Sequence, residues 1–373
     1  MKIGLNATCL NDRPSGAKQR FVGIYGALFN RLPNVEFVLY EPVDCRVADW
    51  FSGSPNVRAV RTPIPSEGRV TKFVGGLGYW PRALQGARFD LFECLNQPLV
   101  KSPTGRTLTT IHDIRRVYPE WPSFVECQVY KSSLRQTLKQ VDRVITVSNT
   151  MKSELLAFDP EARVSVIYNG INLNRFAETS ELEQQVVRKK FGLPHNFLLA
   201  VGHFEPRKNY LRLIDAIALL RDRGHRYNLV IVGNDSGDRR LVEERVVSVG
   251  LGSQVTVLSG LSDMEVRCMY SLCDLFVFPS SYEGFGIPIL EAMAMGVPVV
   301  LSDIPVFREI TQDSGVYFSP NSMEAMAEAI ETTLSSQELL DELVAYGRRR
   351  VQDFSFDSLS AQLVELHESL MKK

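Results

Sequence analysis

Short apolar runs alternate with polar loops along the whole chain. Runs rich in Val, Ile, Leu and Phe predict buried strands. They lie at 2–7, 35–40, 57–60, 90–95, 108–111, 143–147, 163–168, 197–201, 228–232, 254–258, 275–278 and 297–301. Between and after them, apolar residues three and four positions apart predict helices. These are expected at 19–32, 123–140, 148–158, 183–191, 210–223, 262–273, 323–334, 337–350 and 356–370.

The regular alternation of strands and helices predicts an α/β fold in which parallel sheets are covered on both faces. With 373 residues, the chain is long enough for about two domains. Turn residues at 169–172, followed by a polar segment, indicate the boundary. We therefore expect an N-terminal domain at 1–172, a C-terminal domain at 173–355 and a final helix at 356–373.

The stretch from Ser280 to Asp303 carries the most specific chemical signal. It reads as a strand end, a glycine loop with Glu283, a helix whose first turn holds Glu291, and another strand. Pro288 suits the first position of that helix, because its fixed φ fits there and its missing N–H is not needed. Carboxylates accept from hydroxyls, while glycine N–H groups and a helix N-terminus attract anions. This combination favours a sugar phosphate ligand over the alternative of a solvated glutamate in the loop and a glutamate that only complements the helix dipole.

A second signal follows the strand at 197–201, in the sequence Val-Gly-His-Phe-Glu-Pro-Arg-Lys-Asn. Arg207 and Lys208 precede a helix, where the helix dipole disfavours cations. An anion is therefore expected beside them. A diphosphate fits well, since arginine offers a planar fork and lysine a point charge. The alternative is a solvated basic loop.

Charge and composition exclude several other classes. The net charge is −1 and the basic residues are scattered, so nucleic-acid binding is not expected. The apolar run at the N-terminus is too short for a signal peptide, and no apolar stretch reaches the roughly 18 residues of a membrane span. Six cysteines without a C-x-x-C pair indicate reduced thiols in a cytoplasmic protein. The sequence has no D-x-D, so we expect no metal cofactor.

Glu283 and Glu291, with the intervening Gly-Phe-Gly-Ile-Pro-Ile-Leu, resemble the E-x7-E signature of family 4 glycosyltransferases. The Arg207–Lys208 pair, the Ile-His-Asp at 111–113 and the linker at 167–176 extend the resemblance along the chain. The family is retaining and has the GT-B fold: two Rossmann-like domains with parallel sheets facing a central cleft, and a C-terminal helix that crosses back to the N-terminal domain. Within this family, the chain resembles bacterial surface-polysaccharide mannosyltransferases.

The resemblance implies a role for each matched residue. The catalytic group is Arg207, Lys208, Glu283 and His112, where the two cations bind the donor diphosphate and the other two contact the donor sugar. The remaining donor-binding residues are Gly16, Gly202, Ser259, Gly260, Leu261, Gly284, Phe285, Gly286, Ile287 and Glu291, with Glu291 on the ribose and 259–261 at the base. On the acceptor side lie Asn96 and Asp113. A lone His-Asp pair such as 112–113 is also commonly structural.

The expected reaction moves a hexose to a hydroxyl of a saccharide or lipid-linked saccharide in cell-surface polysaccharide synthesis. The expected hexose is mannose, from a GDP-mannose-type donor. The alternatives are a UDP-sugar-dependent transferase of the same fold, a non-catalytic nucleotide-sugar-binding subunit, and an epimerase. One further segment, 68–88, mixes basic and aromatic residues. Such mixtures suit a membrane surface or a lipid acceptor. Its glycines argue against a clean amphipathic helix, so the alternative is an ordinary mobile loop.

Overall fold

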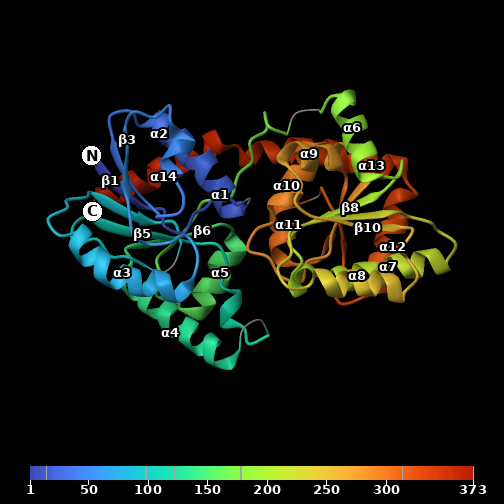
Figure 1. Cartoon of the computed structure of the whole chain (residues 1–373), viewed down its shortest axis with the longest axis horizontal. Helices are drawn as coiled ribbons and strands as arrows, with labels where there is room; N and C mark the ends of the chain where they lie inside the picture. Colours follow the sequence, from blue (N-terminus) through green and yellow to red (C-terminus); the bar gives the residue numbers. More distant parts are fainter. Residues whose placement is uncertain (14, 97–98, 121–122, 177–178, 313, 373) are drawn as a thin grey trace. The chain divides into compact units, whose positions relative to one another are not determined.

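The computed structural model describes residues 1–13, 15–96, 99–120, 123–176, 179–312 and 314–372, without the side chains of 69, 70 and 73. The chain forms two compact units. Unit 1 comprises Met1–Ile171 and Phe354–Lys373, and unit 2 comprises Asn172–Asp353 (Figure 1). These limits lie one or two residues from the boundaries expected at 172 and 356.

Unit 1 is built on a seven-stranded sheet in the order β3-β2-β1-β4-β5-β6-β7. Each neighbouring pair is parallel, as the alternating pattern predicts. The strands are β1 Lys2–Asn6, β2 Glu36–Glu41, β3 Val57–Arg61, β4 Leu91–Cys94, β5 Arg106–Ile111, β6 Arg143–Thr146 and β7 Val164–Val166. Parallel order places the carboxyl ends of β1, β4 and β5 side by side.

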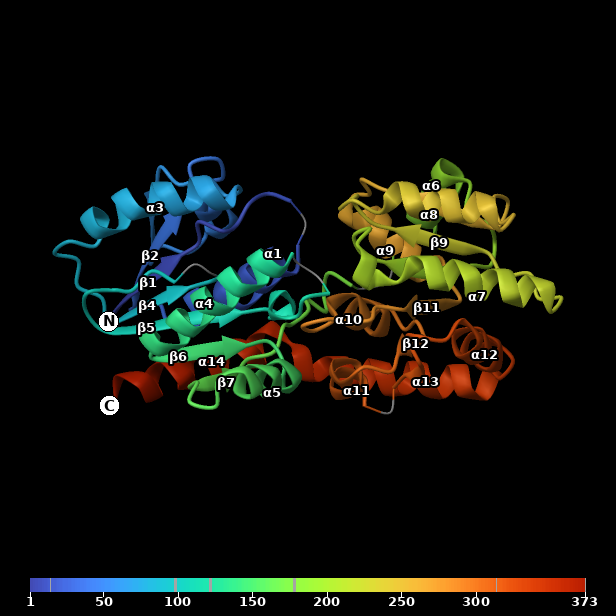
Figure 2. The same cartoon turned by 90° about the horizontal axis from the view of Figure 1, so that it is seen from below.

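Helices cover both faces of this sheet. One face packs against α1 (Gly16–Arg20), η1 (Phe21–Tyr25), α2 (Gly26–Arg31), η2 (Val47–Phe51) and α14 (Phe356–Met371). The opposite face packs against α3 (Arg69–Ala83), α4 (Phe124–Gln140) and α5 (Asn149–Phe158), with η3 (Arg115–Val117) beside α4. Figure 2 shows α3, α4 and α14 around the strands of this unit.

The single helix expected at 19–32 begins earlier and is interrupted by the π-helical turn η1. This turn lies against α14. A Cβ atom at Gly23 would meet the Phe356 ring at 2.2 Å, so only glycine allows the contact. A buried polar cluster anchors the same helix: the Tyr25 hydroxyl donates to Glu93 at 2.5 Å, and His367 Nε2 lies 3.3 Å from the other Glu93 oxygen.

The segment 68–88 is mostly the helix α3, so the alternative of an ordinary loop was wrong. Trp80 and Leu84 are buried against Tyr40 and Phe92 of the sheet. Burial of large side chains contributes about 1.5–3 kcal/mol each, which exceeds the cost of about 1 kcal/mol per helical glycine. The side chains of Arg69 and Phe73 lie outside the described part, so the predicted basic and aromatic mixture is described only in part.

Unit 2 is built on a six-stranded parallel sheet in the order β10-β9-β8-β11-β12-β13. Its strands are β8 Leu198–Val201, β9 Leu229–Val232, β10 Val255–Leu258, β11 Leu275–Phe278, β12 Val299–Ser302 and β13 Val316–Phe318. Its helices are α6 Glu181–Phe191, η4 Pro206–Lys208, α7 Tyr210–Asp222, α8 Arg239–Ser248, α9 Asp263–Leu272, α10 Ile287–Ala294, α11 Pro305–Thr311, α12 Met323–Leu334, α13 Gln337–Arg350 and η5 Val351–Phe354, whose last residue belongs to unit 1. One face of the sheet packs on α7, α8 and α12. Within the described ranges, no helix is both long and apolar enough to span a membrane.

Candidate active site

The residues expected to bind the donor lie where the strands of unit 2 end. Gly202 directly follows β8, the segment 259–261 directly follows β10, and Glu283 follows β11 by five positions. Strands β8 and β11 are neighbours in the sheet, which brings the first and third of these loops together. Ligands of open parallel sheets bind at this carboxyl edge.

A compact charged group, here called the Glu283 cluster, joins these two loops. It consists of Glu205, Arg207, Lys208 and Glu283. One Glu283 carboxylate oxygen accepts from Arg207 Nη1 at 2.5 Å, and the other accepts from Lys208 Nζ at 2.6 Å. Arg207 Nε donates to Glu205 at 2.8 Å. The Glu283 side chain is only 11% exposed, and its two cationic partners, Arg207 and Lys208, are 14% and 7% exposed.

Backbone contacts hold the two cations in this geometry. The 3₁₀ turn η4 ends at Asn209, whose left-handed φ of 57° separates it from α7. The Arg207 carbonyl accepts from Ser281 N at 2.8 Å, and Arg207 NH1 also donates to the Tyr282 carbonyl at 3.2 Å. Lys208 Nζ lies 4.5 Å above the centre of the Phe278 ring. These contacts fix both positive charges before any ligand binds.

Gly202 allows the close packing under Lys208. A Cβ atom at this position would lie 2.9 Å from Lys208 Cε and 3.0 Å from the Tyr210 hydroxyl. The Gly202 carbonyl accepts from that hydroxyl at 2.9 Å. Glycine is therefore needed here to hold the lysine, a different reason from the direct donor contact that the sequence predicted.

The electrostatics keep the cluster ionised. Burial disfavours the charged form of Glu283, but attraction to Lys208 and then Arg207 outweighs it and lowers the pKa of Glu283 to about 2. Burial lowers the pKa of Lys208 below its usual value, and this effect exceeds the attraction of Glu283, which raises the pKa. Since Glu283 is charged and engaged by two cations, it is a weak base and a weak nucleophile, yet its oxygens can still accept from hydroxyls.

Glu291 lies on α10 but in its second turn, because the helix begins at Ile287; the expectation of a first-turn position was wrong. Its carboxylate accepts from the Tyr270 hydroxyl at 2.9 Å. Gly286 caps the helix with a φ of 124° that disfavours other residues. The side chain of Phe285 is buried in the core, so only its backbone and that of Gly284 can meet a ligand here.

The loop expected at the nucleotide base is held by neighbouring side chains. Ser259 Oγ accepts from Arg239 NH1 at 2.9 Å, and Gly260 N donates to Asn234 at 3.3 Å. Leu261 is half-buried. The turn at 233–238 thus borders this loop.

Unit 1 gathers the other predicted residues at its own carboxyl edge. Gly16 begins α1 after β1, Asn96 lies two residues after β4, and His112 directly follows β5. Burial lowers the pKa of His112 to about 4, with Arg20 adding to the effect, so its imidazole is neutral at pH 7. Asp113 accepts from Arg115 N at 3.2 Å in a local turn.

Two residues of the site, Glu205 and Tyr270, were not predicted from the sequence. Glu205 completes the charge balance around Arg207, and its position two residues earlier was an available signal. Tyr270 orients Glu291 from α9, but the two residues are 21 positions apart and leave no local signal in the sequence. Within the described ranges, no group of three or more His, Cys, Asp or Glu side chains is arranged to hold a metal ion.

Comparisons with known proteins agree with this geometry. Residues 183–350 match the family described as glycosyl transferases group 1, and residues 36–175 match glycosyltransferase family 4. The O-antigen chain mannosyltransferase RfbU of Salmonella typhimurium is 33% identical over 266 residues, covering 70% of this chain and 68% of RfbU. The O-antigen chain mannosyltransferase B of Escherichia coli is 29% identical over 269 residues, 71% of each chain.

A solved structure extends the agreement to the fold. Sucrose-phosphate synthase from Thermosynechococcus elongatus superimposes with a TM-score of 0.77 at 22% identity, covering 100% of this chain and 99% of that one. This likeness confirms the GT-B architecture that the resemblance implied. The chain is therefore an enzyme of the glycosyltransferase class, and it belongs to glycosyltransferase family 4.

Proposed function

We propose that the protein transfers a mannosyl group from a GDP-mannose-type donor to a hydroxyl of a saccharide or lipid-linked saccharide in cell-surface polysaccharide synthesis. The names of two relatives, which are O-antigen chain mannosyltransferases, support the sugar and the pathway class. The observation that carries the chemistry is the Glu283 cluster. It offers two fixed cations for a diphosphate and a carboxylate for sugar hydroxyls at the carboxyl edge of unit 2.

In the proposed reaction, the bond between the anomeric carbon and the diphosphate oxygen breaks as the acceptor oxygen bonds to that carbon. Negative charge grows on the departing diphosphate, where Arg207 and Lys208 stabilise it. The departing phosphate takes the acceptor's proton. No metal is required in this scheme, because the two cations supply the positive charge.

The charge state of Glu283 supports attack on the leaving-group face with retention of configuration. Double displacement needs a free carboxylate near the anomeric carbon. Glu283 is engaged by two cations and has a pKa of about 2, so it suits hydroxyl binding better than nucleophilic attack. NMR of the product would test this step, and an inverted anomer would refute it.

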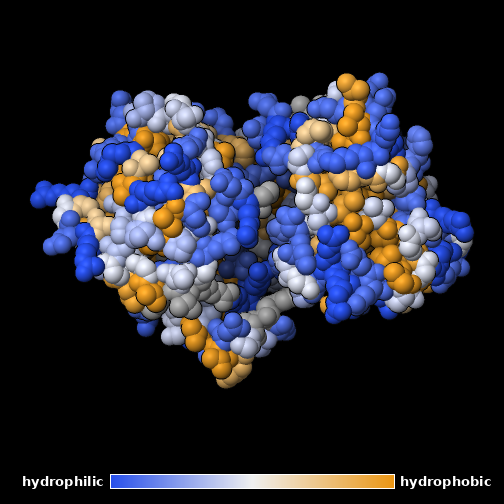
Figure 3. Space-filling view, viewed as in Figure 1, coloured by the Kyte–Doolittle hydropathy of each residue, from blue (hydrophilic) through white to orange (hydrophobic). Residues whose placement is uncertain are grey.

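We also propose that unit 1 touches the inner face of the plasma membrane from the cytoplasm. Val74 and Leu77 on α3 are each 62% exposed, and Phe124, Val125 and Val129 on α4 are 64–72% exposed. Figure 3 shows exposed apolar side chains over the end of α4. Apolar side chains beside basic ones favour an anionic lipid surface. Flotation with phosphatidylglycerol vesicles would test this, and equal recovery with neutral vesicles or none would contradict it.

The donor proposal is tested by calorimetric binding of GDP-mannose, UDP-glucose and dTDP-glucose, first without added metal and then with EDTA. We expect GDP-mannose to bind most tightly and EDTA to have no effect. Preference for the uridine donor would favour the UDP-sugar-dependent alternative. Binding without turnover of any acceptor would favour the non-catalytic subunit.

A further inference from the structure

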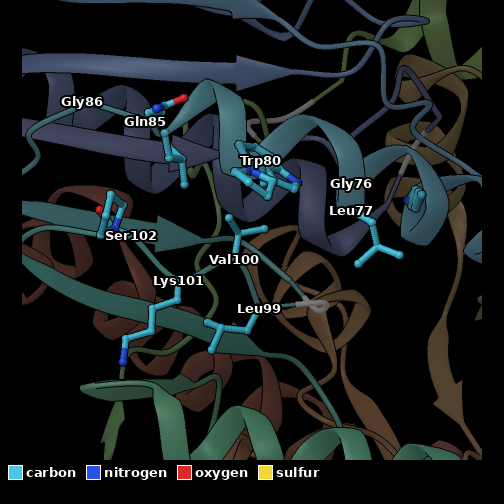
Figure 4. A pocket seen from close by; sticks show the side chains of 13 residues that line it. Gly76, Leu77, Trp80, Gln85, Gly86, Leu99, Val100, Lys101 and Ser102 are labelled. Atoms are coloured by element: carbon cyan, nitrogen blue, oxygen red, sulfur yellow. The ribbon is translucent and has the colours of Figure 1, made fainter.

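Unit 1 contains a cavity of about 810 Å³ between α3 and the segment that leaves β4. Figure 4 shows Leu77 and Trp80 of α3 on one side and Leu99 and Val100 on the other. The volume falls within the range of about 300–1,000 Å³ typical of ligand pockets, which are mostly apolar. None of the residues predicted for the donor or acceptor lines this cavity.

The charges around the cavity indicate the chemistry of its occupant. Its lining includes Lys72 and Lys101, and no described lining residue is acidic. An apolar cavity with only positive charges suits a molecule with an apolar chain and an anionic head. A neutral apolar ligand would leave the two lysines without a role in recognition.

The cavity also has a direction relative to the sheet. Burial raises the pKa of the Cys9 thiol to about 11, and the positive charge of Lys72, near the start of α3, opposes this rise. Lys72 therefore lies on the side of Cys9, which follows the carboxyl end of β1. At the other end, Phe89 N, just before β4, donates to Thr104 at 2.9 Å. The cavity therefore runs from the carboxyl edge, where Asn96 follows β4, toward the amino edge of the sheet.

From these observations we propose that the cavity binds the hydrocarbon chain of a lipid phosphate, with Lys72 receiving the phosphate at the carboxyl edge. A chain placed this way leaves the head group beside Asn96 and His112. The occupant is then the lipid carrier of the saccharide acceptor, an identification that rests on the proposed function. Transfer would depend on the carrier's chain as well as on its sugar.

Calorimetry with hexyl, octyl, decyl and dodecyl phosphate below their micelle concentrations tests the inference. We expect affinity to rise about fourfold for each methylene group until the cavity is filled, because each buried methylene contributes a constant increment. Lys72→Ala should weaken decyl phosphate binding while leaving decanol binding unchanged. Affinity that is independent of chain length would overturn the proposal.

Two neighbouring positions on α3 provide a matched pair of variants. Leu77 lines the cavity and Val74 is not among its lining residues, although both are 62% exposed and both lie outside the buried core cluster of α3. Leu77→Asp should weaken decyl phosphate binding about tenfold or more, since several methylene contacts are lost. Val74→Asp should have no effect. Equal losses in both variants would indicate adsorption to a surface and would overturn the proposal.

Donor binding separates this inference from the proposed function. The donor residues of unit 2 are remote in sequence from α3, so both aspartate variants should bind GDP-mannose like the wild type. Chain-length-dependent alkyl phosphate binding without any sugar transfer would uphold the lipid site and refute the proposed function. Sugar transfer to a lipid-free acceptor, together with alkyl phosphate binding that does not depend on chain length, would uphold the proposed function and refute the lipid site.

Discussion

Replacement of Lys208 by alanine tests whether the Glu283 cluster is a preorganised anion site. The side chain is 7% exposed, its Nζ lies 2.6 Å from Glu283, and its position is fixed by Gly202 and Phe278. Removal of one preorganised electrostatic contact costs about 2.7–4 kcal/mol of transition-state stabilisation, or roughly 10²–10³ in rate. We expect the single-turnover rate with saturating donor to fall by that factor.

The same substitution also affects folding, and the size of that effect can be bounded. Removing one partner of a buried pair costs about 3–5 kcal/mol when the other charge is left uncompensated. In the variant, Glu283 still has Arg207 as a partner at 2.5 Å. The loss of folding stability should therefore be about 3 kcal/mol or less. Urea unfolding at the assay temperature will show whether the variant remains folded.

Lys190→Ala is the matched control in the same unit. Lys190 also forms an ion pair, at 2.5 Å to Glu265, but its side chain is 57% exposed and it lies outside the donor loops. Exposed pairs contribute about 0–1 kcal/mol, so the control should keep its full rate. If Lys208→Ala is folded and its rate stays within twofold of the wild type, the reasoning about preorganised charge is refuted.

Three further outcomes are expected. Because the pKa of Glu283 is about 2 in the folded protein against an ordinary 4.5, its contribution to stability is complete above pH 4.5 and disappears toward pH 2. The stability difference between wild type and Glu283→Gln should shrink over that range in urea titrations; a constant difference would contradict the ion pairs. Gly202→Ala should displace Lys208 and lower the transfer rate by at least tenfold, which corresponds to a rise of about 1.4 kcal/mol in the activation free energy. Wild-type kinetics would argue against the packing of Lys208 on Gly202. Tyr25→Phe should destabilise unit 1 by about 1–3 kcal/mol in thermal unfolding, since Glu93 loses a buried donor; an unchanged melting temperature would count against this.

Much of unit 2 was predictable because its signals are local. The apolar runs at 197–201 and 275–278 give β8 and β11 almost unchanged, since buried parallel strands read as continuous apolar sequence. The positions of Arg207, Lys208 and Glu283 after those strands follow from the same reading. Their direct ion pairs were not predictable, because 75 residues separate Lys208 from Glu283.

Unit 1 departs further from its sequence pattern, and long-range packing explains where. The π-helical turn at 21–25 lies beside Phe356 of α14, a neighbour from the far end of the chain. Helix α3 forms despite its glycines because the Trp80 side chain is buried against the sheet. The π-helical turn and α3 depend on contacts with residues distant in the sequence, and local helix propensity contains no information on such contacts.

We propose above that this glycosyltransferase uses fixed cations to move mannose from a GDP-linked donor. The most direct measurement follows GDP release and mannosylated product from GDP-mannose in EDTA, with and without a lipid-linked saccharide acceptor. We expect GDP and mannosylated product in equal amounts, with both depending on the acceptor and both lost in Lys208→Ala. Tight donor binding with no transfer to any saccharide acceptor, or transfer restored only by metal, would contradict it.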